Sequence, residues 1–305
     1  MRNAACSAWR NLFNEHKFAF LTGDLGFMAL EPLRDLMGPW FINAGVAEQN
    51  MVSAAAGMCK MGTEAWVYSI APFIYARPFE QIRNDVCLNR LPVKIVGNGG
   101  GYAYGSMGSS HHAIEDYGVL LGLQGMQVFV PAFAEDVEPA VCQMSASGQP
   151  GYLRLGRCEK PTDMAVPPFS AWRCLSEGDQ GVMVVVGPVA GSLMQRMRDL
   201  PQDNRPALWA LGVMPEGFTN VPDQLLQTIK NNGLLTVVEE HVAHGSAGHA
   251  LLSTLAQQGV TPKLLHCCAQ GYPSGTYGSQ VFHRLESQMD ADNVLRRWQQ
   301  ESMCL

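Results

Sequence analysis

Short apolar runs alternate with segments of helical pattern along this chain, and that alternation restricts the fold more than any other feature. In the first half of the sequence, six apolar runs have the length and composition of buried strands. They occupy residues 18–22, 40–44, 65–69, 93–97, 127–130 and 152–155. Helical patterns follow Val46, Ala76, His112 and Glu135. Strands and helices in alternation predict an α/β fold with a parallel sheet between layers of helices.

A second series of the same kind follows a break in the pattern. Between Cys158 and Gln180 the sequence holds three prolines and no regular periodicity, which is typical of a linker between domains. Four more strands are expected at residues 182–186, 207–211, 235–239 and 263–266, with helices after Gly191, Asp223 and Gly245. We therefore expect a first domain over residues 1–160, a linker over 161–180 and a smaller α/β domain over 181–305.

Composition excludes several classes of function. A formal net charge of −6 and 21 Lys and Arg among 305 residues argue against nucleic acid or an anionic membrane as the main partner. The nine cysteines form no C-x-x-C pair and no zinc spacing, so we expect reduced thiols, with Cys267 and Cys268 in a buried strand. Neither a signal peptide nor an apolar run of about 18 residues is evident, so a cytoplasmic location is expected.

Glu48 is the lone carboxylate of residues 46–58, a segment that reads as a helix with many small side chains. Such a helix packs closely, and burial of a carboxylate favours its neutral form unless a partner shares a proton with it. A buried Glu48 would be suited to donate to a ring nitrogen, or to share a proton with one. On this segment alone an equal alternative stays open, in which Glu48 is a first-turn acid at the helix start or points to solvent.

Four motifs between residues 43 and 116 occur in the order of one protein family. They are NAGVAEQ at residues 43–49, APF through Arg77 to EQIRN at 71–84, PVKIV at 92–96 and GSMGSSHHAIED at 105–116. Together they resemble the pyrimidine-binding domain of the transketolase family, shared with deoxyxylulose-phosphate synthases and the beta subunits of 2-oxo-acid dehydrogenases. TVVEEHVAHGSAG at residues 236–248 resembles the family's C-terminal domain. The likeness thus covers nearly the whole chain, but only the C-terminal half of a full transketolase.

The resemblance implies thiamine diphosphate as the cofactor and assigns roles to single residues. Glu48 matches the glutamate that activates the cofactor by engaging the far nitrogen of its aminopyrimidine. Phe73 matches the position that stacks on this ring, with Tyr68 as an extension of the stacking surface. Arg77 matches a further position of the cofactor-binding set, and Asp24 matches the aspartate that follows the first strand.

Proton transfer and substrate binding are expected at a second group of side chains. His111 matches the family histidine that faces the thiazolium and the substrate, and an imidazole suits proton transfer near neutral pH. His112 is a second candidate, with a backbone-bonded loop histidine as the alternative. Arg154 is placed near the substrate channel, where a guanidinium binds a phosphate or carboxylate; a surface ion pair is its alternative. His241 and His244 are candidates for which a satisfied loop histidine is the favoured interpretation.

Two departures from the family pattern narrow the function. Sugar-phosphate transketolases carry a histidine soon after the strand at 93–97 and an acidic pair in the glycine-rich loop. This chain has Asn98-Gly99 and Ser106-Met107 at those places, so a different ketose donor or acceptor, such as a modified sugar, is expected. The family's Gly-Asp-Gly motif for the diphosphate and metal is absent from the sequence, and no residue of this chain is assigned to a metal.

These features predict the C-terminal subunit of a split transketolase, which transfers a two-carbon ketol or similar acyl unit from a ketose or 2-oxo donor to an aldehyde or ketone. A separately encoded N-terminal subunit is expected to supply the diphosphate site and Mg²⁺ in an α2β2 assembly with active sites between chains. One alternative is the beta subunit of a 2-oxo-acid or acetoin dehydrogenase, or a deoxyxylulose-phosphate-synthase-like enzyme. A second is a non-catalytic assembly subunit.

Overall fold

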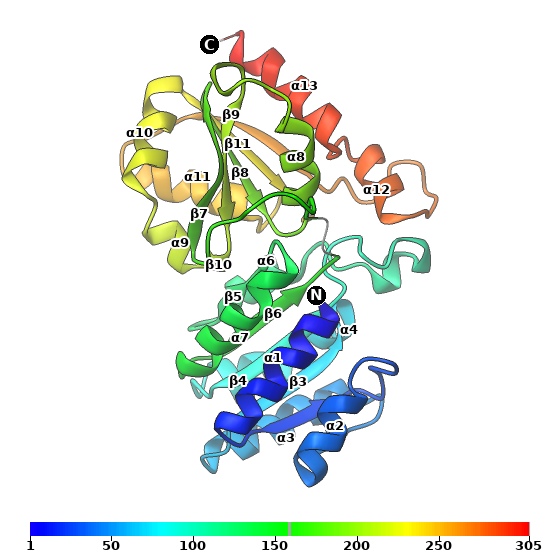
Figure 1. The fold of residues 1–305 in the computed structure, drawn as a ribbon. Helices are drawn as coiled ribbons and strands as arrows, with labels where there is room; N and C mark the ends of the chain where they lie inside the picture. Colours follow the sequence, from blue (N-terminus) through cyan, green and yellow to red (C-terminus); the bar gives the residue numbers. More distant parts are fainter. Residues whose placement is uncertain (158–159, 305) are drawn as a thin grey trace.

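Two mainly parallel sheets, one in each half of the chain, organise the fold (Figure 1). The computed structural model describes residues 1–157 and 160–304. Helices cover both faces of each sheet. The last strand of the first domain ends at Leu155, and the first strand of the second domain begins at Trp172. The α/β class predicted from the alternating pattern is confirmed.

The first sheet contains seven strands in the order β10-β5-β6-β4-β3-β1-β2. Six parallel strands come from the first domain: β1 (Ala19–Thr22), β2 (Phe41–Asn43), β3 (Ala65–Ile70), β4 (Val93–Asn98), β5 (Gln127–Phe129) and β6 (Gly151–Leu155). The seventh, β10 (Val213–Met214), comes from the second half of the sequence and pairs antiparallel with β5. The two halves of the chain therefore share one edge of this sheet.

Two helical layers cover the first sheet. On one face lie α1 (Arg2–Glu15), α2 (Glu31–Met37) and α7 (Val137–Ala146). On the other lie α3 (Glu48–Lys60), α4 (Ala71–Ala76), α5 (Phe79–Gln81), a π-helical segment (Ile82–Cys87) and α6 (Asp116–Leu121). Because successive side chains of a strand face opposite ways, Trp66 of β3 packs on the α1 layer and Val67 on the α3 layer.

The second sheet contains five strands in the order β12-β11-β8-β9-β7. Four are parallel: β8 (Val182–Val186), β9 (Pro206–Leu211), β11 (Leu234–Glu239) and β12 (Lys263–Cys268). β7 (Trp172–Asp179) pairs antiparallel with β9 at one edge. One face carries α8 (Val189–Met197) and α13 (Ala291–Ser302), and the other α10 (Asp223–Asn232) and α11 (Ala247–Gln257). The short helices α9 (Glu216–Thr219) and α12 (Gln280–Glu286) complete the domain.

Every strand expected from the sequence is present, with boundaries within two residues. The expected linker is shorter than predicted because Trp172–Asp179 form β7; as an edge strand, β7 mixes buried and exposed residues and lacks a continuous apolar run. Helices α1, α2, α4, α9, α12 and α13 and the short strand β10 were not expected from the sequence. Cys267 and Cys268 end β12 and are buried, as predicted, whereas Cys158 lies outside the described residues.

The described cysteines are free thiols. Within residues 1–157 and 160–304, none of the helices has the length and apolar character needed to cross a membrane.

Candidate active site

Glu48 is buried at the carboxyl edge of the first sheet. It is the first residue of α3, which follows β2, and it is 3% exposed. Ser69, near the end of β3, donates a hydrogen bond to Glu48 Oε1 at 3.1 Å. Arg77 Nη1 lies 3.0 Å from Oε1 and 2.9 Å from Oε2. The carboxylate thus has one neutral donor and one cationic donor. Glu48 does stand in the first turn of its helix, as one alternative had it, but it does not point to solvent.

Phe73 and Arg77 lie one helical turn apart, so their side chains share a face beside Glu48. Helix α4 starts at Ala71, directly after β3, which brings both residues to the same sheet edge as Glu48. The guanidinium carbon of Arg77 lies 3.9 Å from the centroid of the Phe73 ring. The Arg77 side chain is 42% exposed, so this cation forms the solvent side of the group.

His111 joins the group from the loop between β4 and α6, residues 99–115, which we call the glycine-rich loop. Its ring centroid lies 5.2 Å from that of Phe73, in edge-to-face geometry, and 6.1 Å from that of Tyr104. Ser110 Oγ lies 3.1 Å from His111 Nδ1, and Asn98 Nδ2 donates to the Tyr104 hydroxyl at 2.7 Å. The structure therefore brings Glu48, Phe73, Arg77 and His111 together at one edge of a parallel sheet, the edge at which such sheets bind ligands.

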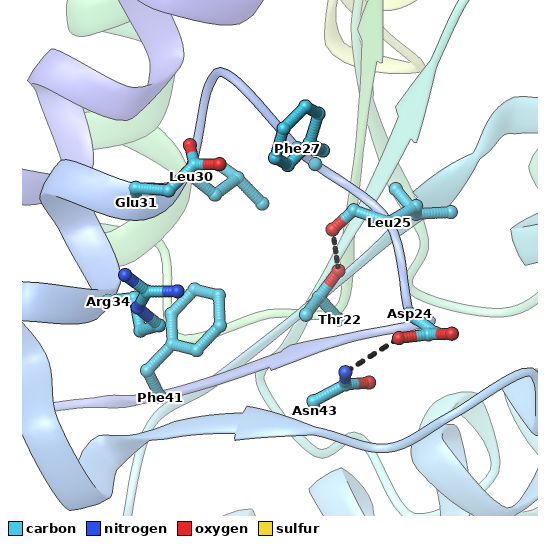
Figure 2. Close-up of a pocket in the computed structure, with 10 residues that line it drawn as sticks. Thr22, Asp24, Leu25, Phe27, Leu30, Glu31, Arg34, Phe41 and Asn43 are labelled. Atoms are coloured by element: carbon cyan, nitrogen blue, oxygen red, sulfur yellow. Dashed lines mark hydrogen bonds between the residues drawn. The ribbon is translucent and has the colours of Figure 1, made fainter.

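Asp24 faces a neighbouring cavity of about 400 Å³ beyond the ends of β1 and β2 (Figure 2). Asn43 Nδ2 donates to Asp24 Oδ1 at 2.8 Å, and the backbone N–H of Gly45 donates to Asn43 Oδ1 at 3.0 Å. Asp24 has a φ of 56°, in the left-handed region that few non-glycine residues adopt. The aspartate is adjacent in sequence to Gly23, where an added Cβ would lie 3.5 Å from Glu48 Oε1. Its cavity thus adjoins the Glu48 group.

Tyr68 does not join the group. It precedes Ser69 on β3, so when Ser69 faces Glu48, Tyr68 faces the opposite side of the sheet. There its ring packs against Trp9 and Phe20, with centroid distances of 6.0 and 6.1 Å, and burial raises the pKa of its hydroxyl. The expectation that Tyr68 extends the stacking surface around Phe73 is therefore corrected: its side chain belongs to the core beneath α1.

His112 faces away from His111 and is buried against the second domain. Its Nδ1 lies 2.9 Å from the Tyr272 hydroxyl, and its Nε2 lies 2.7 Å from the carbonyl oxygen of Gly105. Burial lowers the pKa of the imidazole, so the neutral ring is favoured. The contact of Nε2 agrees with the alternative of a loop histidine bonded to backbone. The contact of Nδ1 differs from it, because the partner is a tyrosine side chain distant in sequence.

Arg154 is buried between the two domains. Its Nε donates to Asp116 Oδ2 at 2.8 Å, and its Nη2 donates to the carbonyl oxygens of Ala113 and Glu240 at 2.7 and 2.9 Å. Tyr152 donates to the same Asp116 oxygen at 2.8 Å. The surface ion pair considered from the sequence is wrong because the partner carboxylate is itself buried, and the structure shows no direct contact between Arg154 and the Glu48 group.

His241 also lies at the domain junction. Its ring stacks on Tyr117 with a centroid distance of 4.0 Å, its Nε2 accepts the backbone N–H of Gly118 at 3.1 Å, and its Nδ1 lies 2.7 Å from the Val242 carbonyl oxygen. These contacts match the favoured interpretation of a satisfied histidine. His244 is exposed, with its ring 6.3 Å from that of His249.

The arrangement fits an aminopyrimidine. A nearly buried carboxylate is suited to engage a ring nitrogen, and the Phe73 ring offers a flat apolar surface beside it. Ser69 and Tyr104 were missed by the sequence analysis. Ser69 could have been found from strand alternation once Glu48 was placed at the sheet edge, whereas the position of Tyr104 depends on the path of an irregular loop.

Comparison with known proteins agrees with this geometry. Residues 16–161 match the family described as "Transketolase, pyrimidine binding domain". The matched residues contain Glu48, Phe73, Arg77 and His111, so the site described above lies within the part of the chain that is similar to this domain.

Components of split transketolases are among its relatives. The chain is 28% identical over 268 residues to one of the subunits of the apulose-4-phosphate transketolase of Actinobacillus succinogenes, a match that covers 83% of this chain and 82% of that protein. It is 29% identical to 1-deoxy-D-xylulose-5-phosphate synthase 1 of Geobacter sulfurreducens over 79% of this chain but only 37% of the synthase. A structure titled "Split gene transketolase, inactive beta4 tetramer" has a TM-score of 0.81 and 25% identity, covering 98% of this chain and 96% of that one.

Proposed function

We propose that this chain is the pyrimidine-binding subunit of a thiamine diphosphate-dependent split transketolase. It would take part in transfer of a two-carbon ketol or similar acyl unit from a ketose or 2-oxo donor to an aldehyde or ketone. The observation that carries the proposal is the buried Glu48 carboxylate in one group with the Phe73 ring, which itself contacts the His111 ring. Two relatives of matching length are named for apulose-4-phosphate, which makes that ketose phosphate the first donor to assay.

Each side chain has a role in this proposal. Thiamine diphosphate, when bound, supplies the nucleophilic carbon that carries the two-carbon unit. Glu48 holds a proton at the ring nitrogen of the aminopyrimidine, and Phe73 stacks on that ring. Arg77 sets the position of the Glu48 carboxylate, and Asp24 lines the adjoining cavity. His111 moves protons to and from the hydroxyl groups of the substrate.

His112 and Arg154 remain part of the proposal as residues that affect substrate binding indirectly. Both side chains are buried and engaged, so their effect on the substrate would pass through the loop they support. The side chain proposed to face the substrate is then His111, which is partly buried in the same loop.

A separate N-terminal subunit would supply the diphosphate and Mg²⁺ site in an α2β2 assembly. Three observations support this: the relatives named as single subunits of a transketolase, the near-complete coverage of a split-gene chain, and the 37% coverage of a single-chain synthase. A cytoplasmic location is proposed with it, supported by the free thiols of the described residues.

The test is ketol transfer by the purified chain mixed with its candidate N-terminal partner. We expect no turnover from either chain alone, turnover from the mixture, and a loss of at least about a hundredfold in Glu48→Gln. Glu80→Gln is the matched control: it makes the same chemical change at an exposed glutamate of α5 and should leave the rate unchanged. Near-wild-type transfer by Glu48→Gln would sink the proposed role of Glu48, and turnover by the isolated chain would sink the split site.

Deoxyxylulose-phosphate-synthase-like chemistry is the second candidate, because several relatives carry that name. It differs from ketol transfer in releasing carbon dioxide from a 2-oxo acid. Measuring carbon dioxide from pyruvate in the mixture therefore separates the two, and the same assay with an added lipoyl acceptor detects a dehydrogenase beta subunit. A mixture that binds thiamine diphosphate but performs neither reaction would favour a non-catalytic assembly subunit.

A further inference from the structure

We infer that a segment of the second domain, Gly271–Ser279, positions His111, and that Tyr272 is the main positioning residue; this rests on the function proposed above. We name this segment the strap. It runs from the end of the second sheet to α12 and lies against the glycine-rich loop of the first domain (Figure 1). The second domain would then act on the chemistry as well as on assembly.

Tyr272 fixes His112, the neighbour of His111. The Nε2 of His112 faces the Gly105 carbonyl oxygen at 2.7 Å and therefore carries the proton, so Nδ1 is the acceptor for the Tyr272 hydroxyl at 2.9 Å. The two rings also stack, with a centroid distance of 5.6 Å. With both nitrogens bonded, the His112 ring has one tautomer and one orientation.

Two further contacts hold the strap to the loop. The Tyr277 hydroxyl donates to Ser109 Oγ at 3.2 Å, and the Tyr102 hydroxyl donates to the Gly271 carbonyl oxygen at 2.9 Å. The backbones also touch: a Cβ added to Gly105 would lie 2.6 Å from the backbone nitrogen of Gln280, so only glycine allows this approach. The loop is thus bound to the strap before and after the short turn Ser109–His111.

This turn transmits the contact to His111. Its backbone is closed by hydrogen bonds from His111 N–H to the Gly108 carbonyl at 3.0 Å and from His112 N–H to the Ser109 carbonyl at 3.2 Å. The adjacent rings face opposite ways, His112 toward the strap and His111 toward Phe73. A displacement of His112 therefore moves the His111 ring relative to Phe73. A misplacement of a catalytic side chain by about 1 Å can lower the rate about a hundredfold.

Glu240 binds the helix α12, which begins where the strap ends. Its carboxylate accepts Gln280 Nε2 at 3.1 and 3.0 Å and Arg284 Nε at 2.6 Å. Its backbone carbonyl accepts Arg154, and a Cβ on Gly101 would lie 2.4 Å from its Oε2. One buried carboxylate thereby contacts α12, which directly follows the strap, and the start of the glycine-rich loop.

The experiment compares wild type, Tyr272→Phe, Tyr277→Phe and Leu193→Ala in the two-subunit enzyme. Tyr272→Phe removes the hydroxyl that holds His112, so kcat should fall about tenfold or more, whereas KM for both substrates should stay within about twofold. Tyr277→Phe should show a smaller fall in the same direction. Leu193→Ala is the control, since it opens a cavity in the core beneath α8 without touching the strap. At assay temperatures below the unfolding temperature of this variant, its kcat should equal that of wild type.

A spectroscopic measurement on the isolated full chain is independent of turnover. Long-range ¹H–¹⁵N correlation spectra should show His112 as the Nε2–H tautomer in wild type and a mixed or exchanging ring in Tyr272→Phe. An active wild type with unchanged kcat in both tyrosine variants would overturn the inference, as would an equal fall of kcat in Leu193→Ala. Inactive wild-type enzyme would instead contradict the proposed function, and the His112 spectra would then still decide whether the strap fixes the loop. If Tyr272→Phe fails to fold, Tyr277→Phe decides by the same criteria.

Discussion

Arg77 binds both carboxylate oxygens of Glu48, at 3.0 and 2.9 Å. The same guanidinium covers the ring of Phe73, so the residue that neutralises Glu48 also occupies the ring surface proposed for the cofactor. With 42% of its side chain exposed, Arg77 has room to move aside when a flat ring binds. This relationship makes Arg77 the first target for substitution.

Arg77→Ala should lower the free energy of unfolding by about 1–3 kcal/mol, because it leaves a buried carboxylate with Ser69 as its remaining donor. Urea denaturation of the isolated chain measures this change. Arg83→Ala removes an exposed arginine from the next segment and should stay within about 0.5 kcal/mol of wild type. Equal effects of the two substitutions would mean that the Glu48 contact contributes nothing specific.

Phe73→Leu should weaken thiamine diphosphate binding to the two-subunit complex by about 2- to 10-fold, the amount expected when a ring stack worth about 0.5–1.5 kcal/mol is lost. Titration with the cofactor, followed by calorimetry, gives the dissociation constant. Phe218→Leu makes the same chemical change at a buried residue of α9 and should leave the affinity unchanged. An unaltered dissociation constant in Phe73→Leu would remove Phe73 from the cofactor site.

Arg154→Met should destabilise the chain by about 3–5 kcal/mol, because it strands the Asp116 carboxylate in the interior. Arg34→Met breaks the exposed pair with Asp35 and should cost at most about 1 kcal/mol. Thermal or urea unfolding distinguishes the two. The double variant Arg154→Met, Asp116→Asn should recover part of the loss; a loss as small as that of Arg34→Met would show that the buried pair is dispensable.

Lys94 predicts a dependence of stability on pH. It is fully buried in β4, and burial lowers its pKa from 10.5 to about 8. As pH rises from about 8 to about 10.5, the folded chain gives up this proton while the unfolded chain keeps it, so the stability of wild type relative to Lys94→Met should increase.

Urea denaturation of both proteins at pH 7, 8, 9 and 10 measures that difference. Lys60→Met, at an exposed position of α3, serves as the control and should show no trend over the same range. A constant difference between wild type and Lys94→Met across the series would contradict the lowered pKa.

Local pattern was sufficient for most of the first domain, where strands with continuous apolar runs were placed to within two residues. Glu48, Phe73, Arg77 and His111 came from the resemblance of their motifs to a known family. The structure brings these four side chains together, and their roles stay a prediction. The failures have physical causes. Strand β7 was assigned to the linker because an edge strand has one polar side, and Tyr68 was assigned to the site although strand alternation turns it away from Ser69.

By itself the sequence determined the elements and the chemistry of single residues, because strand and helix periodicity and the type of each side chain are local properties. Only the tertiary structure decided the partners: Asp116 for Arg154, and Tyr272 for His112 across 160 positions of the chain. These contacts arise where the carboxyl ends of two separate sheets meet, and no local pattern encodes which residues face each other there. The same meeting point explains why a glycine-rich segment that reads as a ligand loop is also packed against the second domain.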